Sequence, residues 1–381
     1  MPEVQIFEGA IDKGLEGIVA CSTAVSSIQG NTLFYRGFTI EDLAANSNFE
    51  EVTFLLWQDR LPSASEFEKF KSEIAAEFSL PSGLIAALKV LPAKGVHPMQ
   101  WLRTAFSMMS HWDAEANDIS PESNAKKAIK MLAKMGSLVC AFEAIRNGKE
   151  VVTPKKDKSV AWNFMYMLGG GKEPNTEHVK IFDTCLILHA DHELNCSAFA
   201  TRVTSSSLSD MYSAITSALG ALKGPLHGGA NEQVMLMLKK IGTNEKAQQF
   251  VKDALAAKEK VMGIGHRVYK DGDPRAAILR KLSDKLTAAI GEHHLYEMST
   301  LIDDTMNKEK GLMPNVDFYS ATVYYSLGIP IDIYTPIFAV SRIAGWIAHA
   351  NEQYANNRIY RPRGKWTGKM GQKWTALGSR G

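Results

Sequence analysis

Cysteine is scarce in this chain of 381 residues, which contains only Cys21, Cys140, Cys185 and Cys196. No two of them have the CxxC spacing of zinc or thioredoxin-like sites, so we expect four reduced thiols and neither chemistry. No sign of charge dominates, because 43 Lys and Arg residues face 41 Asp and Glu residues. A net charge of +2 gives no reason to expect a nucleic acid or a membrane surface as a partner.

Membrane-spanning and targeting segments are also missing. The most apolar late stretch, YTPIFAVSRIAGWIAHA, is interrupted by Arg342 and is shorter than a helix that crosses a bilayer. The N-terminal region contains Glu3, Glu8, Asp12 and Glu16 and no basic segment followed by an apolar run. We therefore expect no signal or transit peptide and predict a cytoplasmic protein.

Nucleotide signatures are absent too. The stretch GIGHRV lacks the third glycine of GxGxxG and follows no clear strand, and GxxxxGK[ST] does not occur. These absences argue against a nucleotide-binding α/β enzyme.

The chain does have strong helical periodicity. Residues 1–38 hold β-favouring pieces around a Gly30-Asn31 turn signal and predict a short hairpin. From residue 39 onward, apolar residues recur at helical spacing, and prolines separate the runs. Predicted helix starts lie at Thr39 (with Asp42), Ser65, Ser120-Pro121 and Ser209 or Asp210. The prediction is an all-α fold with a minor N-terminal β-hairpin.

The helical pattern also suggests two domains. Residues 336–356 predict a long apolar helix at the centre of the protein. We place the first part of a large helical domain at 1–223, a small helical domain at 224–331, and the rest of the large domain at 332–381. The last of these includes a basic, glycine-rich tail that we expect to form an extended arm.

His227 is the first candidate for chemistry. It stands in GALKGPLHGGANEQV, between a helix-stopping Gly224-Pro225 and Gly228-Gly229. This places the ring at or just before a new helix N-terminus, whose dipole lowers the pKa of a histidine and leaves a neutral N–H donor for a carbonyl oxygen. A histidine packed in a helix corner, without a catalytic role, is the alternative.

The stretch VMGIGHRVYKDGDPRAAILR supplies the second candidate. Gly263 and Gly265 remove side chains just before His266 and are expected to leave main-chain amides open to a ligand. Asp273-Pro274 is a helix start, so Arg275 falls in the first turn. His266 and Arg275 are predicted to meet one substrate carboxylate, with the arginine binding it in bidentate fashion.

Further charged candidates lie in two later stretches. Asp317, in KGLMPNVDFYSATVYYSLGI, is either an ordinary helix cap or a general base beside the two histidines. Arg342 is in an otherwise apolar helix and needs an anion, either a protein carboxylate or a ligand, and Arg361 follows in IYRPRG. Together these groups suit proton abstraction next to a carbonyl and attack on a polyanionic acceptor.

The HADHE run at 189–193 suggests a metal site at first sight. On a helix, however, His189, Asp191, His192 and Glu193 would point to more than one face and could not all reach one ion. We therefore predict no metal site.

The chain resembles the citrate synthases, of the short bacterial and archaeal type. The resemblance is carried by GLEGIVACSTAVSSIQGNTLFYRGFTIEDLA, HPMQWLRTAFS, LHADHELNCSAFATRV, GALKGPLHGGANE, GIGHRVYKDGDPR, PNVDFYSATVYYSLGI, TPIFAVSRIAGWIAHANEQ and NNRIYRPR, which together cover nearly the whole chain. It implies an almost entirely helical homodimer whose active site lies in a cleft between a large and a small domain and closes on oxaloacetate. No cofactor is implied beyond acetyl-CoA as co-substrate.

The resemblance also implies a role for each matched residue. Asp317 would remove a methyl proton from acetyl-CoA, His227 would donate to the thioester oxygen, and His266 would polarise the ketone of oxaloacetate. The implied oxaloacetate and citrate contacts are His192, Asn195, Arg275, Arg342 and, from the partner subunit, Arg361. The implied CoA contacts are Lys260, Gly263, Ile264, Gly265 and Lys310. Hydrolysis of citryl-CoA would then release citrate and CoA.

Three alternatives stay open at this point. A 2-methylcitrate synthase, which uses propionyl-CoA, would share nearly every motif, because one methylene discriminates weakly. A metal-dependent hydrolase would use HADHE with the other histidines. A helical scaffold without chemistry would make the glycine-flanked histidines incidental.

Overall fold

The computed structural model describes residues 13–266, 268, 269 and 271–380, which fall into two compact units. One unit consists of Met1–Ser22 and Ile359–Gly381, and the other of Thr23–Arg358. In its described residues, the first unit has only the short 3-10 helices η1 (Lys13–Leu15) and η4 (Leu377–Ser379). Apart from η4, the described residues of its C-terminal part form no helix or strand, and all of them except the half-buried Tyr360 are exposed.

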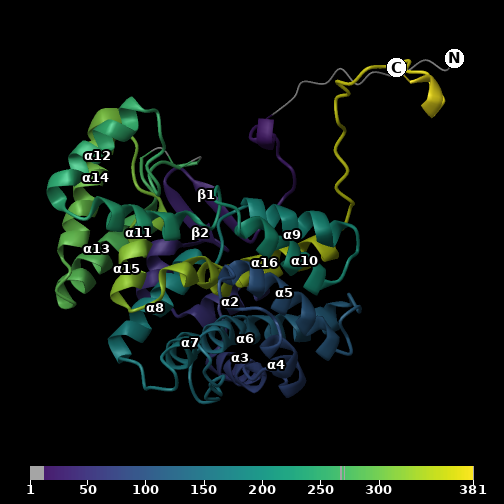
Figure 1. Cartoon of the computed structure of the whole chain (residues 1–381). Helices are drawn as coiled ribbons and strands as arrows, with labels where there is room; N and C mark the ends of the chain where they lie inside the picture. The colour runs from purple at the N-terminus through teal and green to yellow at the C-terminus, as the bar shows by residue number, and fades with distance from the viewer. Residues whose placement is uncertain (1–12, 267, 270, 381) are drawn as a thin grey trace. The chain divides into compact units, whose positions relative to one another are not determined.

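The unit Thr23–Arg358 is built almost entirely from helices (Figure 1). Its described residues form α1 (Ile40–Asn46), α2 (Phe49–Gln58), α3 (Ala64–Glu77), α4 (Ser82–Lys89), α5 (Pro98–Met109), α6 (Pro121–Arg146), α7 (Val160–Leu168), α8 (Thr176–His189), α9 (Cys196–Ser206), α10 (Met211–Leu222), α11 (Ala230–Ile241), α12 (Asn244–Ala256), α13 (Pro274–Ala289), α14 (His294–Lys310), α15 (Val316–Ser326) and α16 (Tyr334–Ala355). Two 3-10 turns, η2 (Ser110–Trp112) and η3 (Ile331–Ile333), complete the helical part. The predicted all-α class is confirmed.

The small sheet confirms the hairpin and adds a strand to it. Strands β1 (Ser26–Gln29) and β2 (Thr32–Tyr35) pair antiparallel, and Gln29 faces Thr32 across the predicted Gly30-Asn31 turn. A third strand, β3 (Phe38–Thr39), pairs with β2 after a turn in which Arg36 and Gly37 both have positive φ.

Helix α16 is the central element of this unit. Every residue from Tyr334 to Ala350 is buried, and the helix packs against α2, α5, α6, α8, α9 and α10. Figure 1 shows it running between these helices. The apolar sequence of 336–356 therefore predicted both the helix and its position.

Most predicted helix starts are confirmed by their caps. The side chains of Thr39, Ser120 and Asp210 accept hydrogen bonds from the first turns of α1, α6 and α10. Helix α3 begins earlier than expected, because Ser63 rather than Ser65 is its cap. Ser63 forms a reciprocal capping box with Glu66, which satisfies two backbone donors at once.

Helices α11 to α15 contact one another and fall within the range predicted for a small domain. They belong to the same compact unit as α1 to α10 and α16, so boundaries at 223/224 and 331/332 remain a prediction. None of the helices formed by the described residues is both long and apolar enough to cross a membrane.

Candidate active site

His227 lies in the turn between α10 and α11, three residues before α11 begins. Its backbone N–H donates to the Gly224 carbonyl at 2.9 Å. Gly228 is required here because a Cβ would lie 2.5 Å from Cδ1 of Leu222, at the end of α10. The same atom on Gly229 would be 3.6 Å from its nearest neighbour. Gly228 therefore allows the turn to pack closely against the end of α10.

The His227 ring is neutral, as predicted, but for a different reason. Burial lowers its pKa to about 3, and the nearby positive charge of Arg342 adds to the effect. The helix dipole is therefore not the main cause. The Nε2 atom of His227 lies 2.8 Å from Oγ of Ser197, which also contacts Asn195 and Trp346. No local pattern signalled Ser197 or Trp346, because the contacts that link them to each other and to His227 join separate segments of the chain.

The loop that carries His266 is tied to the segment that precedes Asp317. Ile264 forms an isolated antiparallel bridge with Pro314, and the Gly265 N–H donates to the Met313 carbonyl at 2.7 Å. The Ile264 N–H donates to the Val261 carbonyl at 3.3 Å. These main-chain groups were expected to be open to a ligand, but they are hydrogen-bonded within the protein.

Gly263 itself has no room for a side chain, since a Cβ would lie 2.7 Å from Val234 and 3.0 Å from Phe318. Its φ of +76° also favours glycine. The loop therefore packs directly against α11 and α15.

His266 has a tautomer fixed by its surroundings. Its Nδ1 atom accepts hydrogen bonds from the N–H groups of Val268, at 3.0 Å, and Tyr269, at 3.2 Å. Nδ1 is thus unprotonated, and the single proton of the neutral ring is on Nε2. Burial and the charge of Arg275 lower the pKa of His266 to about 4. The ring is therefore a neutral donor through Nε2, which is what polarising a ketone requires.

Arg275 lies in the first turn of α13, directly after the predicted Asp273-Pro274 start. Its Nε and Nη2 atoms donate to the two carboxylate oxygens of Asp273 at 2.9 and 2.7 Å. Although burial opposes the charge, the Asp273 carboxylate raises the pKa of Arg275. Asp273 occupies the edge formed by Nε and Nη2, so the predicted bidentate contact would use the other edge, formed by Nη1 and the second N–H of Nη2.

Asp317 is not the cap of its helix. Asn315 caps α15 by accepting from the Asp317 N–H at 3.0 Å, which leaves the Asp317 carboxylate without a capping role. Its Oδ1 atom is buried and has no hydrogen-bond partner among the residues that the structure describes. Burial raises the pKa of Asp317 to about 7, with Arg275 and Arg342 opposing the rise. A carboxyl group with this pKa suits general base catalysis at neutral pH.

Arg342 projects from the central helix and is only 1% exposed. Its Nε donates to the His189 carbonyl at 2.7 Å, and its guanidinium lies 4.6 Å from the centre of the Phe338 ring. Among the carboxylates of the described ranges, none is within 4.0 Å of it. Burial lowers the pKa of Arg342 to about 10. The protein salt bridge considered as an alternative is thus absent from the described residues, and the cation is available to an anionic ligand.

The side chains of the HADHE run point to different partners, as expected, but the run does not lie on one helix. Helix α8 ends at His189, so the following residues lie on a turn. Nδ1 of His189 contacts the Cys185 carbonyl, Asp191 contacts His349, and Nε2 of His192 lies 3.1 Å from the Tyr269 hydroxyl. No cluster of three or more potential metal ligands occurs in the part of the chain that the structure describes.

Most of the predicted residues come together around the two arginines. The pKa of His192 is well below its usual value because of burial and the charges of Arg275 and Arg342. The His192 and His266 rings are 5.1 Å apart. Asp317 responds to the same two arginines. The three predicted catalytic groups and His192 therefore share one electrostatic environment.

The predicted CoA contacts lie at the edge of this group or outside it. Lys260 is exposed in the segment after α12, and Lys310 is the exposed last residue of α14. Arg361 belongs to the unit that contains the chain ends and is exposed there.

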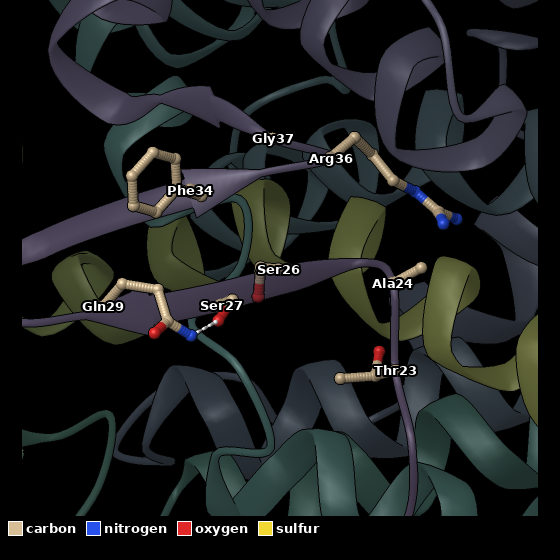
Figure 2. A pocket seen from close by; sticks show the side chains of 8 residues that line it. All are labelled: Thr23, Ala24, Ser26, Ser27, Gln29, Phe34, Arg36 and Gly37. Carbon is tan, nitrogen blue, oxygen red and sulfur yellow. Dashed lines mark hydrogen bonds between the residues drawn. The ribbon is translucent and has the colours of Figure 1, made fainter.

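Described residues of the unit Thr23–Arg358 line a small and a larger cavity. The smaller, of about 180 Å³, is lined by Gly265, His266, Tyr269, Gly272, Asp273, Gly311, Leu312, Met313 and Pro314. The larger, of about 310 Å³, lies along β1 and β2 and is lined by Thr23, Ala24, Ser26, Ser27, Gln29, Phe34, Arg36 and Gly37 (Figure 2). No predicted site residue lines the larger one. Its Ser26 does reach Asp191, at 2.5 Å, one residue before His192.

Several contributing residues were missed by the sequence reading. Tyr269 was part of a quoted motif but had no assigned role, and Asp273 was recognised only as a cap. Both contact predicted site residues directly. A tyrosine three residues after His266 and an acidic cap two residues before Arg275 were the available signals.

Comparison with known proteins identifies a family that matches nearly the whole chain. The family model "Citrate synthase, C-terminal domain" matches residues 14–363. "Citrate synthase 2" of Bacillus subtilis (strain 168) is 52% identical over 368 residues, 97% of this chain and 99% of that protein. "Citrate/2-methylcitrate synthase" of the same organism is 42% identical over 358 residues, 93% of this chain and 96% of that protein.

A solved structure shows the same fold. Citrate synthase from Thermoplasma acidophilum, in a ternary complex with carboxymethyl coenzyme A and oxaloacetate, has a TM-score of 0.92 and 33% identity. The similarity covers 97% of this chain and 100% of that one. The family match, the near-complete coverage and the shared fold lead to one conclusion: the chain belongs to the citrate synthase family.

Proposed function

We propose that this protein condenses acetyl-CoA with oxaloacetate and hydrolyses the resulting citryl-CoA to citrate and CoA. The observation that carries the proposal is the buried carboxylate of Asp317, which does not cap its helix and has a pKa of about 7. The charges of the same arginines also act on the neutral histidines. This is the chemistry needed to remove a weakly acidic proton next to a carbonyl.

In the first step, the Asp317 carboxylate takes a proton from the methyl group of acetyl-CoA. The thioester oxygen gains electron density as the enol forms and accepts a hydrogen bond from His227. Because the pKa of His227 is about 3, the ring stabilises the enol as a neutral donor and does not protonate the thioester beforehand.

In the second step, the enol carbon attacks the ketone carbon of oxaloacetate and forms the new carbon–carbon bond. His266 donates through Nε2 to the ketone oxygen, which becomes the hydroxyl of citryl-CoA. The proton that Asp317 removed from the methyl group balances the one that this oxygen gains, and Asp317 returns to the carboxylate form. Arg275, Arg342, His192 and Asn195 hold the carboxylates of oxaloacetate. The support for Arg342 is that it is a buried cation without a carboxylate at ion-pair distance among the described residues. Water then cleaves the thioester and releases CoA.

The remaining assignments also belong to the proposal. Gly263, Ile264 and Gly265 form the proposed adenine-binding loop, with Lys260 and Lys310 near the phosphates. The protein acts as a homodimer in which Arg361 reaches the partner's active site, and residues 224–331 form the small domain. The support for the dimer is that the apolar side chains of Trp366, Trp374 and Leu377 are exposed in the C-terminal segment.

The test is release of free CoA thiol by the purified protein. We expect thiol release with acetyl-CoA only when oxaloacetate is present, and citrate as the product. Release that does not depend on oxaloacetate would instead indicate a simple thioesterase, and no release would refute the proposal.

The acyl preference is tested in the same assay. Relatives include a citrate/2-methylcitrate synthase, so propionyl-CoA is the second substrate to measure. We expect a higher kcat/KM with acetyl-CoA. The reverse order would make 2-methylcitrate synthase the function.

A further inference from the structure

The hydroxyl of Ser197 is the meeting point of three hydrogen bonds. Ser197 is fully buried in the first turn of α9. Its Oγ lies 2.8 Å from Oδ1 of Asn195, 2.8 Å from Nε2 of His227 and 2.9 Å from Nε1 of Trp346. Two of these neighbours already have proposed roles in the reaction. Ser197 and Trp346 do not.

A proton count restricts what this hydroxyl can do. A serine hydroxyl has one proton and two lone pairs, and an indole N–H can only donate. Trp346 therefore occupies one lone pair. One proton and one lone pair remain for Asn195 and His227.

The atom of Asn195 that faces Ser197 is its oxygen, because the Ala198 N–H donates to the same atom at 3.1 Å. The amide nitrogen points instead to the carbonyls of His192 and Glu193. Oδ1 can only accept. Ser197 can therefore donate its proton to only one of its two remaining partners, Asn195 and His227. If Ser197 donates to Asn195, it must accept from His227, and if it donates to His227, it leaves Asn195.

This choice decides which nitrogen of His227 carries the proton. The ring is neutral and has only one N–H proton. When Ser197 donates to Asn195, that proton is on Nε2, and Nδ1 presents a lone pair. When Ser197 donates to Nε2, the proton is on Nδ1. Because Nε2 always faces Ser197, Nδ1 is the atom left for the thioester oxygen, and only the second arrangement can donate to it.

We propose that Ser197 is a two-position proton switch that sets the tautomer of His227, and that oxaloacetate changes its position through Asn195. The inference rests on the proposed function. The present contacts of the Asn195 amide nitrogen are long, at 3.4 Å to each carbonyl. A carboxylate of oxaloacetate forms a stronger, charge-assisted hydrogen bond with that nitrogen. Turning the amide towards the carboxylate carries Oδ1 away from Ser197 and leaves His227 as the acceptor.

Trp346 acts in this switch as a positioning residue. Its fixed N–H donor holds one lone pair of Ser197 and polarises the hydroxyl, which makes the O–H a better donor and the oxygen a weaker acceptor. The weaker acceptor disfavours the arrangement in which His227 donates to Ser197, and it therefore favours the one in which His227 is protonated on Nδ1. Oxaloacetate thereby prepares the enol-stabilising donor before acetyl-CoA reacts.

The direct test is nitrogen NMR of the wild-type protein labelled with ¹⁵N-histidine, with and without oxaloacetate and in the absence of acetyl-CoA. The His227 signals are identified by their loss in His227→Asn. We expect Nε2 to be protonated in the free protein and Nδ1 in the oxaloacetate complex. An unchanged tautomer in a protein that does release CoA would overturn the switch but not the proposed function. A protein that releases no CoA from both substrates would refute the function itself.

Variants supply the second test. Trp346→Phe keeps an aromatic ring but removes the N–H, and we expect kcat to fall by up to about tenfold, with the KM for oxaloacetate changed less than about twofold. Trp57→Phe is the matched control, because the Trp57 N–H donates to the Ala344 carbonyl at 2.9 Å and has no link to the switch. Equal losses of kcat in the two variants would contradict a specific role for Trp346.

Ser197→Ala removes the switch itself. We expect a lower kcat and a His227 tautomer that no longer responds to oxaloacetate. Ser299→Ala is the control, since Ser299 is equally buried but its hydroxyl only donates to Leu295 of its own helix. A tautomer that still responds in Ser197→Ala would overturn the assignment to this hydroxyl. If Ser197→Ala does not fold, the measurement on the wild-type protein still decides.

Discussion

The two histidine sites of this protein are built differently. The Nδ1 atom of His266 faces two backbone N–H groups, which can only donate. The Nε2 atom of His227 faces a hydroxyl, which can donate or accept. The contacts of the first ring fit one neutral tautomer, whereas those of the second fit both. The tautomer of His266, which only has to polarise a ketone, is fixed by its contacts. The proposed switch instead lets the tautomer of His227 change, because its partner is a hydroxyl that can donate or accept.

The largest effect should come from removing the base that both rings serve. Asp317→Asn keeps both histidine environments but cannot accept the methyl proton, so we expect kcat to fall by about 10²–10⁴-fold. The measurement is thiol release at saturating substrates. Asp303→Asn is the control, because the Asp303 carboxylate is about as buried as that of Asp317. It binds Tyr319 and Arg280 and contacts no proposed reacting group. A comparable loss in Asp303→Asn would show that the effect is one of folding.

A pH profile of kcat/KM separates the base from the two rings. Asp317 must be ionised to act, and with a pKa of about 7 it loses activity as pH falls. We expect about a tenfold decrease per pH unit below 7, or about 100-fold at pH 5. Neither histidine should add an ionisation above pH 5, because their pKa values are about 3 and 4. A second ionisation between pH 5 and 6.5 would contradict the neutral-ring comparison.

Amide substitutions test which nitrogen of each ring donates. The asparagine amide ends near the position of Nδ1, and the glutamine amide near that of Nε2. At position 227 we expect His227→Asn to retain more activity than His227→Gln, and at position 266 we expect His266→Gln to exceed His266→Asn. Each pair should differ by about tenfold, as for one hydrogen bond to a reacting oxygen. The same residue being preferred at both positions would remove the distinction between the rings.

The smallest effect concerns the turn that supports His227. Gly228→Ala places a methyl group 2.5 Å from a Leu222 side chain and 2.7 Å from its carbonyl. We expect a loss of about 1–3 kcal/mol in the free energy of unfolding, measured by denaturant titration. Gly229→Ala has its nearest contact at 3.6 Å and should change stability by less than about 0.5 kcal/mol. Equal losses at the two positions would mean that crowding against α10 does not define the turn.

The sequence predicted much of this arrangement, and the exceptions have a common cause. The helical fold, the hairpin, the central helix and the Asp273-Pro274 start all follow from local patterns of periodicity and capping. The glycines beside His227 and His266 also correctly indicated that these histidines lie in turns between helices. These features depend on neighbouring residues, so they can be read from one stretch of chain.

The details of the site depend instead on contacts across the fold. The bond from Trp346 to Ser197 joins residues separated by 149 positions, and no local pattern signals it. The ion pair between Asp273 and Arg275 is local, but the sequence pattern indicated only that Asp273 caps the helix. For Asp317, the sequence left cap and base open, and the choice required seeing that Asn315 is the cap.

Asn315 does more than begin α15. Its N–H binds the Gly263 carbonyl and its side chain binds the Gly265 carbonyl, both at 2.9 Å. The strand of chain leading to His266 and the helix end bearing Asp317 are therefore clamped into one piece. When the protein fluctuates, we expect His266 and Asp317 to move together as one unit, so that the distance between them is preserved. We therefore expect the assembly of the three proposed reacting groups to depend on one variable, which is the distance from this unit to His227.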